Sequence, residues 1–170
     1  MLTLVIGGSG SGKSRYAEAL IAAQPEPRVY LATMRPADGE SDRRVLRHRT
    51  QREGLCFQTL ERYTDLAGAS VPLGSSVLLE DLGNLLANEM FDPEGGGAAA
   101  VRTGLEVLLG RCANLCVVSN EVFSGGSDYA GETLDYLKEL AALNRELAAK
   151  ADKVVELVCG LPNVLKGGAE

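Results

Sequence analysis

The chain has 170 residues, a length that suits one domain with a complete hydrophobic core. Its formal net charge of −6 argues against a general nucleic-acid-binding protein, although a local positive field can still bind small phosphorylated ligands. The first eight residues, MLTLVIGG, lack the charged start of a signal peptide, and no apolar run is long enough to span a bilayer. We therefore expect a cytoplasmic protein that binds neither nucleic acid nor membrane.

Short apolar runs bounded by turn-forming residues predict strands, and amphipathic segments between them predict helices. We place the strands at 2–6, 28–32, 76–80, 115–120 and 153–158, the last of which ends the predicted sheet. We place the helices at 14–23, 40–52, 81–90, 97–110 and 131–150, with a Gly/Pro-marked loop from residue 91. Strands that alternate with helices indicate an α/β fold, with a mostly parallel sheet covered on both faces. We see one domain over residues 1–170.

The first predicted strand is followed by GGSGSGKS, residues 7–14, which fits the P-loop pattern G-x-x-x-x-G-K-[ST]. Glycines allow backbone N–H groups to turn towards a phosphate, and a helix N-terminus adds partial positive charge. We expect Lys13 to reach the outer phosphates and Ser14 to bind Mg²⁺. The loop itself would bind nucleotide through Gly7, Gly8, Ser9, Gly10, Ser11 and Gly12. A glycine turn with a chance Lys-Ser pair is the disfavoured alternative.

The segment SDRRVLRHRTQRE, residues 41–53, contains the only histidine of the chain. On a helix, Arg44, His48 and Arg52 lie at i, i+4 and i+8 and share one face. Neighbouring cations disfavour the protonated imidazole, and the same arginines can neutralise phosphates. This pattern would suit nucleophilic attack by His48 on a phosphorus atom, although spacing alone favours a solvated basic helix. On that interpretation the histidine is carried by chance on a solvent-exposed face, and both interpretations stay open at this point.

Acidic residues end the predicted strand at 76–80. Glu80 and Asp81 stand where a P-loop protein needs a second partner for its metal ion. A carboxylate at this point can hold Mg²⁺ directly or through water. The alternative is that both acids only end a strand and favour the start of the next helix.

Polar residues near the end of the chain are candidates for substrate contact. SNEV, residues 119–122, ends a strand at the sheet edge where open α/β folds bind ligands. Asn120 and Glu121 are placed to contact a base, a ribose or a substrate, unless they only form a polar turn. Asn144 stands among apolar neighbours in the long helix, either as a substrate contact or as a solvent-facing residue.

The four cysteines form no C-x-x-C pair, and one histidine cannot complete a Cys/His zinc set. We interpret Cys56, Cys112, Cys116 and Cys159 as reduced, mostly buried thiols. A metal or redox site at Cys112 and Cys116 is the less favoured alternative.

Several shorter motifs accompany the P-loop in a fixed order. They are YLAT at 30–33, DGE at 38–40, RVLRHRTQR at 44–52, FQTLE at 57–61, LLED at 78–81, Asn88, SNEV at 119–122 and LNRELAAKAD at 143–152. His48 and Arg52 occupy an H-x-x-x-R pattern. With the P-loop, this ordered set resembles the cobinamide kinase/cobinamide-phosphate guanylyltransferase family of cobalamin synthesis over nearly the whole chain.

The resemblance implies a RecA-like P-loop fold and a homo-oligomer, expected to be a trimer with shared sites. It implies that ATP or GTP phosphorylates adenosylcobinamide, with Mg²⁺ as the metal ion. GTP then donates GMP to His48, and adenosylcobinamide phosphate takes up the GMP to give adenosylcobinamide-GDP. The resemblance also assigns nucleotide binding to Thr33, Arg44, Arg52 and Glu61, and substrate binding to Asn120, Glu121 and Asn144.

The chain departs from the family pattern at two places. FSGGSDYAGETLDYLKEL, residues 123–140, replaces the G-x-G-I-V-P and later F-R-D of many members, so corrinoid contacts are most open to change there. Asp81 stands where many members have cysteine. A guanylyltransferase without kinase activity, a simple P-loop kinase of another small alcohol, and a nucleotide-binding switch are therefore the competing hypotheses.

Overall fold

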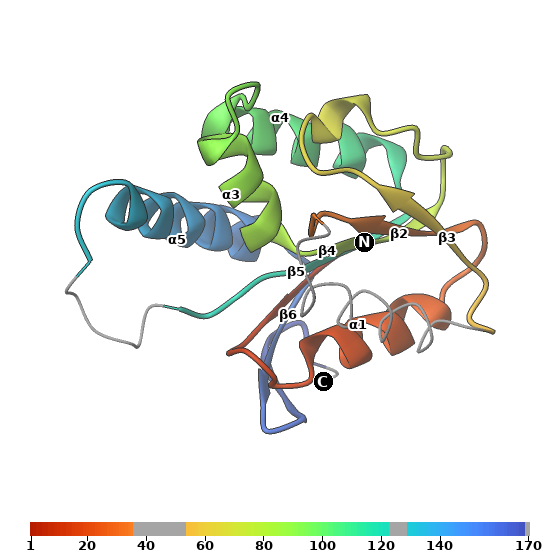
Figure 1. The fold of residues 1–170 in the computed structure, drawn as a ribbon. Coiled ribbons are helices and arrows are strands. Elements are labelled where there is room, and N and C mark those ends of the chain that lie inside the picture. Colours follow the sequence, from red (N-terminus) through yellow and green to blue (C-terminus); the bar gives the residue numbers. More distant parts are fainter. Residues whose placement is uncertain (36–53, 123–128, 169–170) are drawn as a thin grey trace.

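The structure, a computed structural model, describes residues 1–35, 54–122 and 129–168. A seven-stranded sheet forms its centre, in the order β3-β2-β4-β5-β1-β6-β7 (Figure 1). The strands are β1 (Leu2–Ile6), β2 (Arg28–Ala32), β3 (Phe57–Glu61), β4 (Ser76–Glu80), β5 (Asn114–Val118), β6 (Lys153–Val158) and β7 (Leu161–Lys166). All neighbouring strands pair in parallel, except that β7 runs antiparallel to β6.

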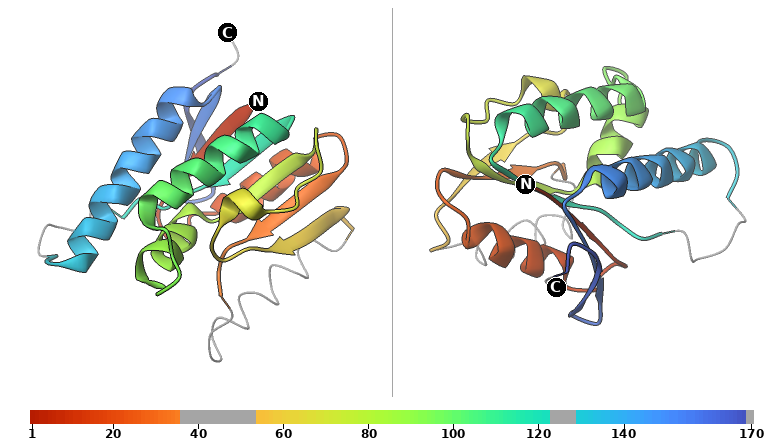
Figure 2. Two further views of the ribbon diagram at one scale, coloured as in Figure 1. Left: turned by 90° about the horizontal axis from the view of Figure 1, so that it is seen from above. Right: turned by 180° about the vertical axis from the view of Figure 1, so that it is seen from behind.

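Helices cover both faces of this sheet (Figure 2). They are α1 (Lys13–Ala22), α3 (Leu82–Phe91), α4 (Gly97–Arg111) and α5 (Glu132–Lys150), with a short 3₁₀ turn at Leu66–Gly68. Helix α1 packs on one face, and the other three helices pack on the opposite face. None of the helices in the described ranges is long and apolar enough to cross a membrane.

Two hydrophobic cores result from the alternation of side chains along the central strands. In β4, Val77 and Leu79 pack in the core under α3, α4 and α5, whereas Leu78 packs in the core under α1. In β1, Leu4 and Val5 divide in the same way. These strands are buried on both faces, which explains their continuous apolar sequences. Parallel pairing then brings their carboxyl ends to one edge of the sheet.

The predicted fold class is confirmed. Strands β1, β2, β4 and β6 have the predicted bounds, and α1, α3, α4 and α5 begin and end within one residue of prediction. Strand β5 ends at Val118, two residues earlier than expected, although the Ser119 amide still donates to the Val5 carbonyl. Strand β5 lies between the P-loop strand β1 and the acid-bearing strand β4, which agrees with the expected RecA-like arrangement. The predicted helix at 40–52 lies outside the described residues.

Two strands were missed by the sequence patterns. Strand β3 is the edge strand next to β2, and it mixes partly buried and exposed residues instead of forming an apolar run. Strand β7 is exposed at all six positions, so the expectation that β6 ends the sheet is wrong. Both errors have one physical cause, because the edge strands bury too little surface to show the pattern of a buried strand.

Candidate functional site

The P-loop leaves β1 after Ile6 and reaches the first turn of α1 at Lys13. Gly12 caps the helix with φ of 97°, a left-handed conformation that favours glycine. No side chain of the described residues caps this helix end by a hydrogen bond. The amide groups of the first turn therefore stay available to a phosphate, and the helix dipole favours an anion there.

Lys13 lies over this loop and is only 7% exposed. Its Nζ donates a hydrogen bond of 2.7 Å to the Gly8 carbonyl. Burial lowers the pKa of Lys13, while the nearby carboxylates of Glu80 and Asp81 raise it. The ammonium group is thus held between the loop and the acidic end of β4, at the place where the sequence predicted contact with phosphate.

Ser14 and Glu80 meet across the sheet edge. The Ser14 hydroxyl donates a hydrogen bond of 2.6 Å to Glu80 Oε1, which joins the start of α1 to the end of β4. A hydroxyl and a carboxylate are hard oxygen ligands that suit Mg²⁺. A P-loop site requires one of each from the protein, and phosphate oxygens and water complete the shell. The residues present therefore fit the ion, although no cluster of three or more His, Cys, Asp or Glu occurs in the described ranges.

Asp81 caps helix α3. Its Oδ1 accepts from the Asn84 backbone amide at 2.7 Å, and its Oδ2 accepts from the Asn84 side-chain amide at 2.8 Å. Burial raises the pKa of Asp81, whereas hydrogen bonds from Asn84 and the charge of Lys13 lower it. The structure therefore gives Asp81 a capping role, beside the pair formed by Ser14 and Glu80.

Thr33 follows β2 and is fully buried. Its hydroxyl donates to the Asp81 carbonyl and accepts from the Asp81 amide, both at 2.7 Å. Both hydrogen-bonding functions of the hydroxyl are engaged by the backbone of Asp81. This arrangement supports a role in positioning the end of β4 rather than direct contact with nucleotide. Glu61, at the end of β3, is exposed and accepts a hydrogen bond of 2.8 Å from the Tyr63 hydroxyl.

The segment after β5 lies against the start of the P-loop. The Glu121 amide donates to the Gly7 carbonyl at 3.0 Å. The Asn144 side-chain amide donates to the Asn120 carbonyl at 3.4 Å, and Asn144 is half-buried. The Asn144 side chain is thus partly enclosed, and its contact with substrate stays a prediction. Asn144 fixes the backbone that carries Asn120 and Glu121 next to the loop.

Two residues that carried no predicted role complete this edge of the sheet. The Asn88 side-chain amide donates to the Thr33 carbonyl at 2.8 Å and to the Tyr63 carbonyl at 3.0 Å, which ties the ends of β2 and β3 to α3. The Tyr136 hydroxyl donates to the Gly83 carbonyl at 3.2 Å. Asn88 could have been found from its place in the motif order, whereas Tyr136 resembles an ordinary buried aromatic of an amphipathic helix.

The basic segment stays a prediction, because Arg44, His48 and Arg52 lie outside the described residues. The chain enters this segment after Arg35 and returns from it at Gly54. Thr33 precedes this segment in the sequence and Tyr63 follows it, and the Asn88 side chain donates hydrogen bonds to the carbonyls of both residues.

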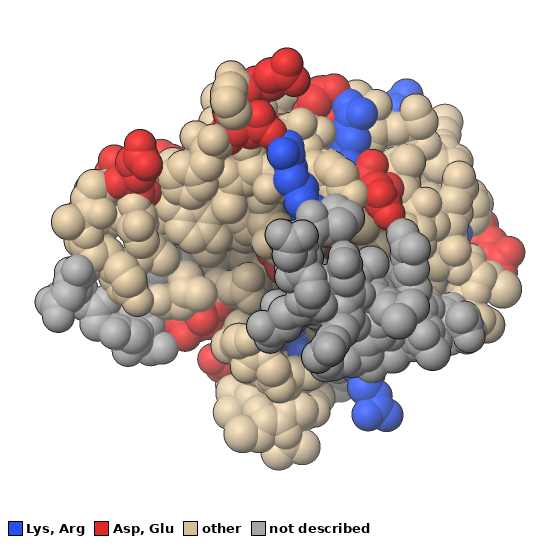
Figure 3. Space-filling view, in the orientation of Figure 1, with Lys and Arg blue, Asp and Glu red and all other residues tan. Residues whose placement is uncertain are grey.

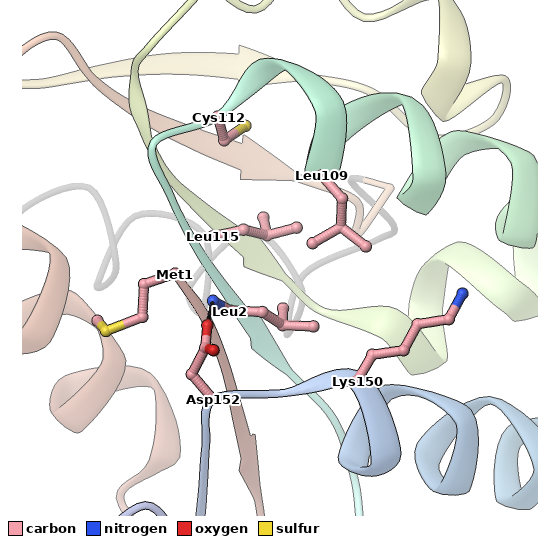
Figure 4. A pocket seen from close by; sticks show the side chains of 7 residues that line it. All are labelled: Met1, Leu2, Leu109, Cys112, Leu115, Lys150 and Asp152. Atoms are coloured by element: carbon pink, nitrogen blue, oxygen red, sulfur yellow. Dashed lines mark hydrogen bonds between the residues drawn. The ribbon is translucent and has the colours of Figure 1, made fainter.

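A separate pocket lies at the opposite edge of the sheet, where β1, β5 and β6 begin (Figure 4). It is lined by Met1, Leu2, Leu109, Cys112, Leu115, Lys150 and Asp152. The Asp152 carboxylate accepts a hydrogen bond of 2.6 Å from the Leu2 amide within it. Because the P-loop follows the other end of β1, this pocket is not part of the candidate nucleotide site.

The cysteines are less buried than predicted. Cys116 is buried and Cys112 is partly buried. Burial raises the pKa of the Cys112 thiol to about 11. Cys56 and Cys159 are exposed, so the expectation of mostly buried thiols is wrong for these two. Both stand in turns with positive φ, directly before β3 and between β6 and β7. These are the two strands that the sequence patterns missed.

Comparison with known proteins gives matches over nearly the whole chain. Residues 3–165 match the family described as cobinamide kinase/cobinamide phosphate guanyltransferase. The bifunctional adenosylcobalamin biosynthesis protein CobP of Pseudomonas aeruginosa is 34% identical over 174 residues, which cover 98% of each chain. The corresponding CobU proteins of Salmonella typhimurium and Escherichia coli are 32% and 30% identical, each covering 95% of this chain and 97% of the relative.

Among solved structures, the chain is similar to the P4 protein of bacteriophage phi6 in complex with ADP. The TM-score is 0.43 at 14% sequence identity, and the match covers 96% of this chain and 52% of that chain.

Proposed function

The chain belongs to the cobinamide kinase/cobinamide phosphate guanyltransferase family, and we propose that it catalyses both reactions in adenosylcobalamin biosynthesis. The observation that carries this proposal is the hydrogen bond between Ser14 and Glu80 beside the P-loop. It joins the two protein groups that a phosphoryl-transfer enzyme needs for its metal ion, inside a family match that spans the chain.

In the kinase reaction, the loop from Gly7 to Gly12 holds the phosphates of ATP or GTP through backbone amides. Lys13 exchanges its bond to the Gly8 carbonyl for the outer phosphates and neutralises charge that develops on their oxygens. Ser14 and Glu80 would hold Mg²⁺, with Asp81 beside them, and the bound ion would further neutralise the triphosphate. The substrate hydroxyl forms a bond to the γ-phosphorus, its proton leaves, and the nucleoside diphosphate departs.

In the guanylyl transfer, an imidazole nitrogen of His48 attacks the α-phosphorus of GTP, and the bond to pyrophosphate breaks. A phosphate oxygen of adenosylcobinamide phosphate then displaces the imidazole and forms adenosylcobinamide-GDP. Arg44 and Arg52 neutralise the phosphates during both steps. Glu61 contributes to nucleotide binding from the end of β3, and Thr33 contributes through the backbone of Asp81.

We assign the corrinoid substrate to the side of the site formed after β5. Asn120 and Glu121 lead out of this strand next to the P-loop, and Asn144 supports them from α5. Tyr136 lies in the part of the chain that departs from the family pattern, and its hydroxyl reaches the first turn of α3. The contacts to the substrate alcohol are therefore expected to differ from those of other members on this side.

We also propose a homotrimer that works in the cytoplasm. Strand β7 presents apolar side chains to solvent, with Leu161 72% exposed and Val164 and Leu165 also exposed. The hairpin of β6 and β7 projects from the body of the protein with mainly uncharged side chains at the lower centre of Figure 3. An exposed apolar edge of this kind supports association between subunits. All four thiols are free, which suits a reducing compartment.

The first experiment tests the histidine. The purified protein is incubated with Mg²⁺ and α-labelled GTP, denatured, and examined for bound label, in parallel with His48→Ala and with Gln51→Ala as a control in the same segment. We expect acid-labile, base-stable label on the parent and on the control, and none on His48→Ala.

A kinase assay with γ-labelled ATP and adenosylcobinamide is run on the same three proteins. Phosphorylation that survives in His48→Ala would show that the two reactions use separate groups. Intact GTP binding without label on the parent protein would refute guanylyl transfer and favour a simple kinase.

A further inference from the structure

The turn between β6 and β7 is in direct backbone contact with the P-loop. The Gly160 amide donates a hydrogen bond of 2.9 Å to the Ser11 carbonyl. The Gly160 Cα lies 3.3 Å from the position that a Cβ on Gly12 would take, and a Cβ on Gly7 would lie 2.6 Å from the Leu157 carbonyl oxygen. At these positions the phosphate-binding loop and the end of β6 therefore pack main chain against main chain.

Strand β7 is held by its pairing with β6 and by contacts at its two ends, rather than by the hydrophobic core. All six residues of β7 are exposed, so the strand adds little to the buried apolar surface. At the end far from the P-loop, Lys166 Nζ donates to the carbonyls of Ala148 and Ala149, at 3.1 and 2.9 Å, in the last turn of α5. At the other end, the attachment is the bond from Gly160 to Ser11.

A hydrogen bond to a loop carbonyl also fixes the direction of the next amide. In a trans peptide unit, the C=O of one residue and the N–H of the next point in opposite directions. Because the Ser11 carbonyl points to the hairpin, the Gly12 amide points away from it. The Glu121 amide acts in the same way on the Gly7 carbonyl at 3.0 Å, and so directs the Gly8 amide. Successive amides that turn into one concavity make an anion-binding site.

We propose that Gly160 is a positioning residue for triphosphate binding, because its amide holds the Ser11 peptide in the orientation that presents N–H groups to phosphate. This inference rests on the proposed nucleotide chemistry and adds to it a structural element of the C-terminal hairpin. In this role the turn acts on the phosphates through the P-loop and not on the base. Its effect is therefore the same for every ligand that carries the triphosphate group.

Gly160 has φ of +81° and open space around the position of a Cβ. Gly160→Ala thus strains the turn without a clash, whereas Gly160→Asn is milder because asparagine tolerates the left-handed region. Gly74→Ala is the matched control. Gly74 also has open space and a φ of +76°, but it precedes β4 at the opposite edge of the sheet.

The test measures dissociation constants for inorganic tripolyphosphate, ATP and GTP on the parent and the three variants, with thermal melting as the check on folding. We expect Gly160→Ala to weaken the binding of all three ligands by one common factor of about five to ten. Gly160→Asn should weaken their binding less, and Gly74→Ala should leave the three dissociation constants unchanged. These factors correspond to about one unfavourable backbone conformation. If Gly160→Ala does not fold, the comparison of Gly160→Asn with Gly74→Ala carries the test.

Parental affinity for tripolyphosphate in a folded Gly160 variant would overturn the proposal. So would a loss confined to ATP and GTP, since that result would place the turn at the base or ribose. The outcome is separable from the histidine experiment. A protein that binds tripolyphosphate but forms no GMP adduct would refute guanylyl transfer and would still report on Gly160.

Discussion

The P-loop and the end of β4 build the two halves of the candidate site from different groups. The P-loop is shaped by glycines and backbone hydrogen bonds, which come from Gly160 and Glu121 on neighbouring segments. The end of β4 is shaped by side chains, because Thr33 brackets the backbone of Asp81 and Ser14 bonds to Glu80. Changes at the first half should therefore act on the binding of any triphosphate, and changes at the second half should act on the chemistry.

Lys13 belongs to both halves, so Lys13→Ala should have the largest effect. The buried ammonium lies between the Gly8 carbonyl and the acidic residues of β4, and both reactions require a held triphosphate. We expect the rates of phosphorylation and of guanylyl transfer each to fall by about 1000-fold, at the upper end of what one electrostatic group supplies. Steady-state assays of both reactions measure this. Lys138→Ala, at an exposed position of α5, is the control. One reaction retained at the parental rate would mean that the two reactions use different nucleotide sites.

Glu80→Gln should separate chemistry from binding. The glutamine keeps an oxygen that can accept from Ser14, but it removes the negative charge that suits Mg²⁺. We expect kcat for phosphorylation to fall by about 100-fold, with a higher Mg²⁺ concentration needed for half-maximal rate, and little change in nucleotide affinity measured without Mg²⁺. If affinity without Mg²⁺ fell as far as the rate, Glu80 would act on the loop instead of on the metal ion.

Thr33→Val should show how the end of β4 is held. Valine keeps the shape of threonine but leaves the amide and the carbonyl of Asp81 without their partner in a buried place. We expect a loss of about 1–3 kcal/mol in the free energy of unfolding, measured by denaturant titration. We also expect about a tenfold lower kcat, because Glu80 and Asp81 would lose their fixed position. Thr33→Ser retains the hydroxyl, so it should keep most of the parental stability and most of the parental kcat. Equal losses in Thr33→Ser and Thr33→Val would contradict the role of the hydroxyl in holding the end of β4.

The strands that position these groups could be predicted because they are buried on both faces. Their apolar runs, such as LTLVI and SVLLE, gave the bounds of β1 and β4 and placed Lys13, Ser14 and Glu80 at one sheet edge. The bond from Gly160 to Ser11 could not be predicted, because it depends on a hairpin whose second strand is exposed throughout. The hydrogen bonds between Thr33 and Asp81 also have no sequence signal. Threonine is a common residue, and its partners are backbone groups 48 positions away in the sequence.

Asp81→Asn should give the smallest effect, and it tests whether Asp81 caps α3 or binds the metal ion. Asparagine is as good a helix cap as aspartate, so the bond to the Asn84 amide should persist. If capping is the role of Asp81, both activities should change less than about threefold, far less than in Glu80→Gln. A loss as large as that of Glu80→Gln would identify Asp81 as a metal ligand.

The pH dependence of stability gives a second reading of the same variant. Burial raises the folded-state pKa of Asp81 above the ordinary value of 3.8, so the folded parent binds the proton more tightly than the unfolded chain. This residue therefore stabilises the parent below pH 3.8, and the contribution is lost as the pH rises through the folded-state pKa. Asp81→Asn lacks this dependence, so its stability relative to the parent should increase from acid to neutral pH. Denaturant titrations of the parent and the variant at an acidic and at a neutral pH measure this difference in stability. A difference of the opposite sign would show that the hydrogen bonds and the charge of Lys13 outweigh burial at the Asp81 carboxyl group.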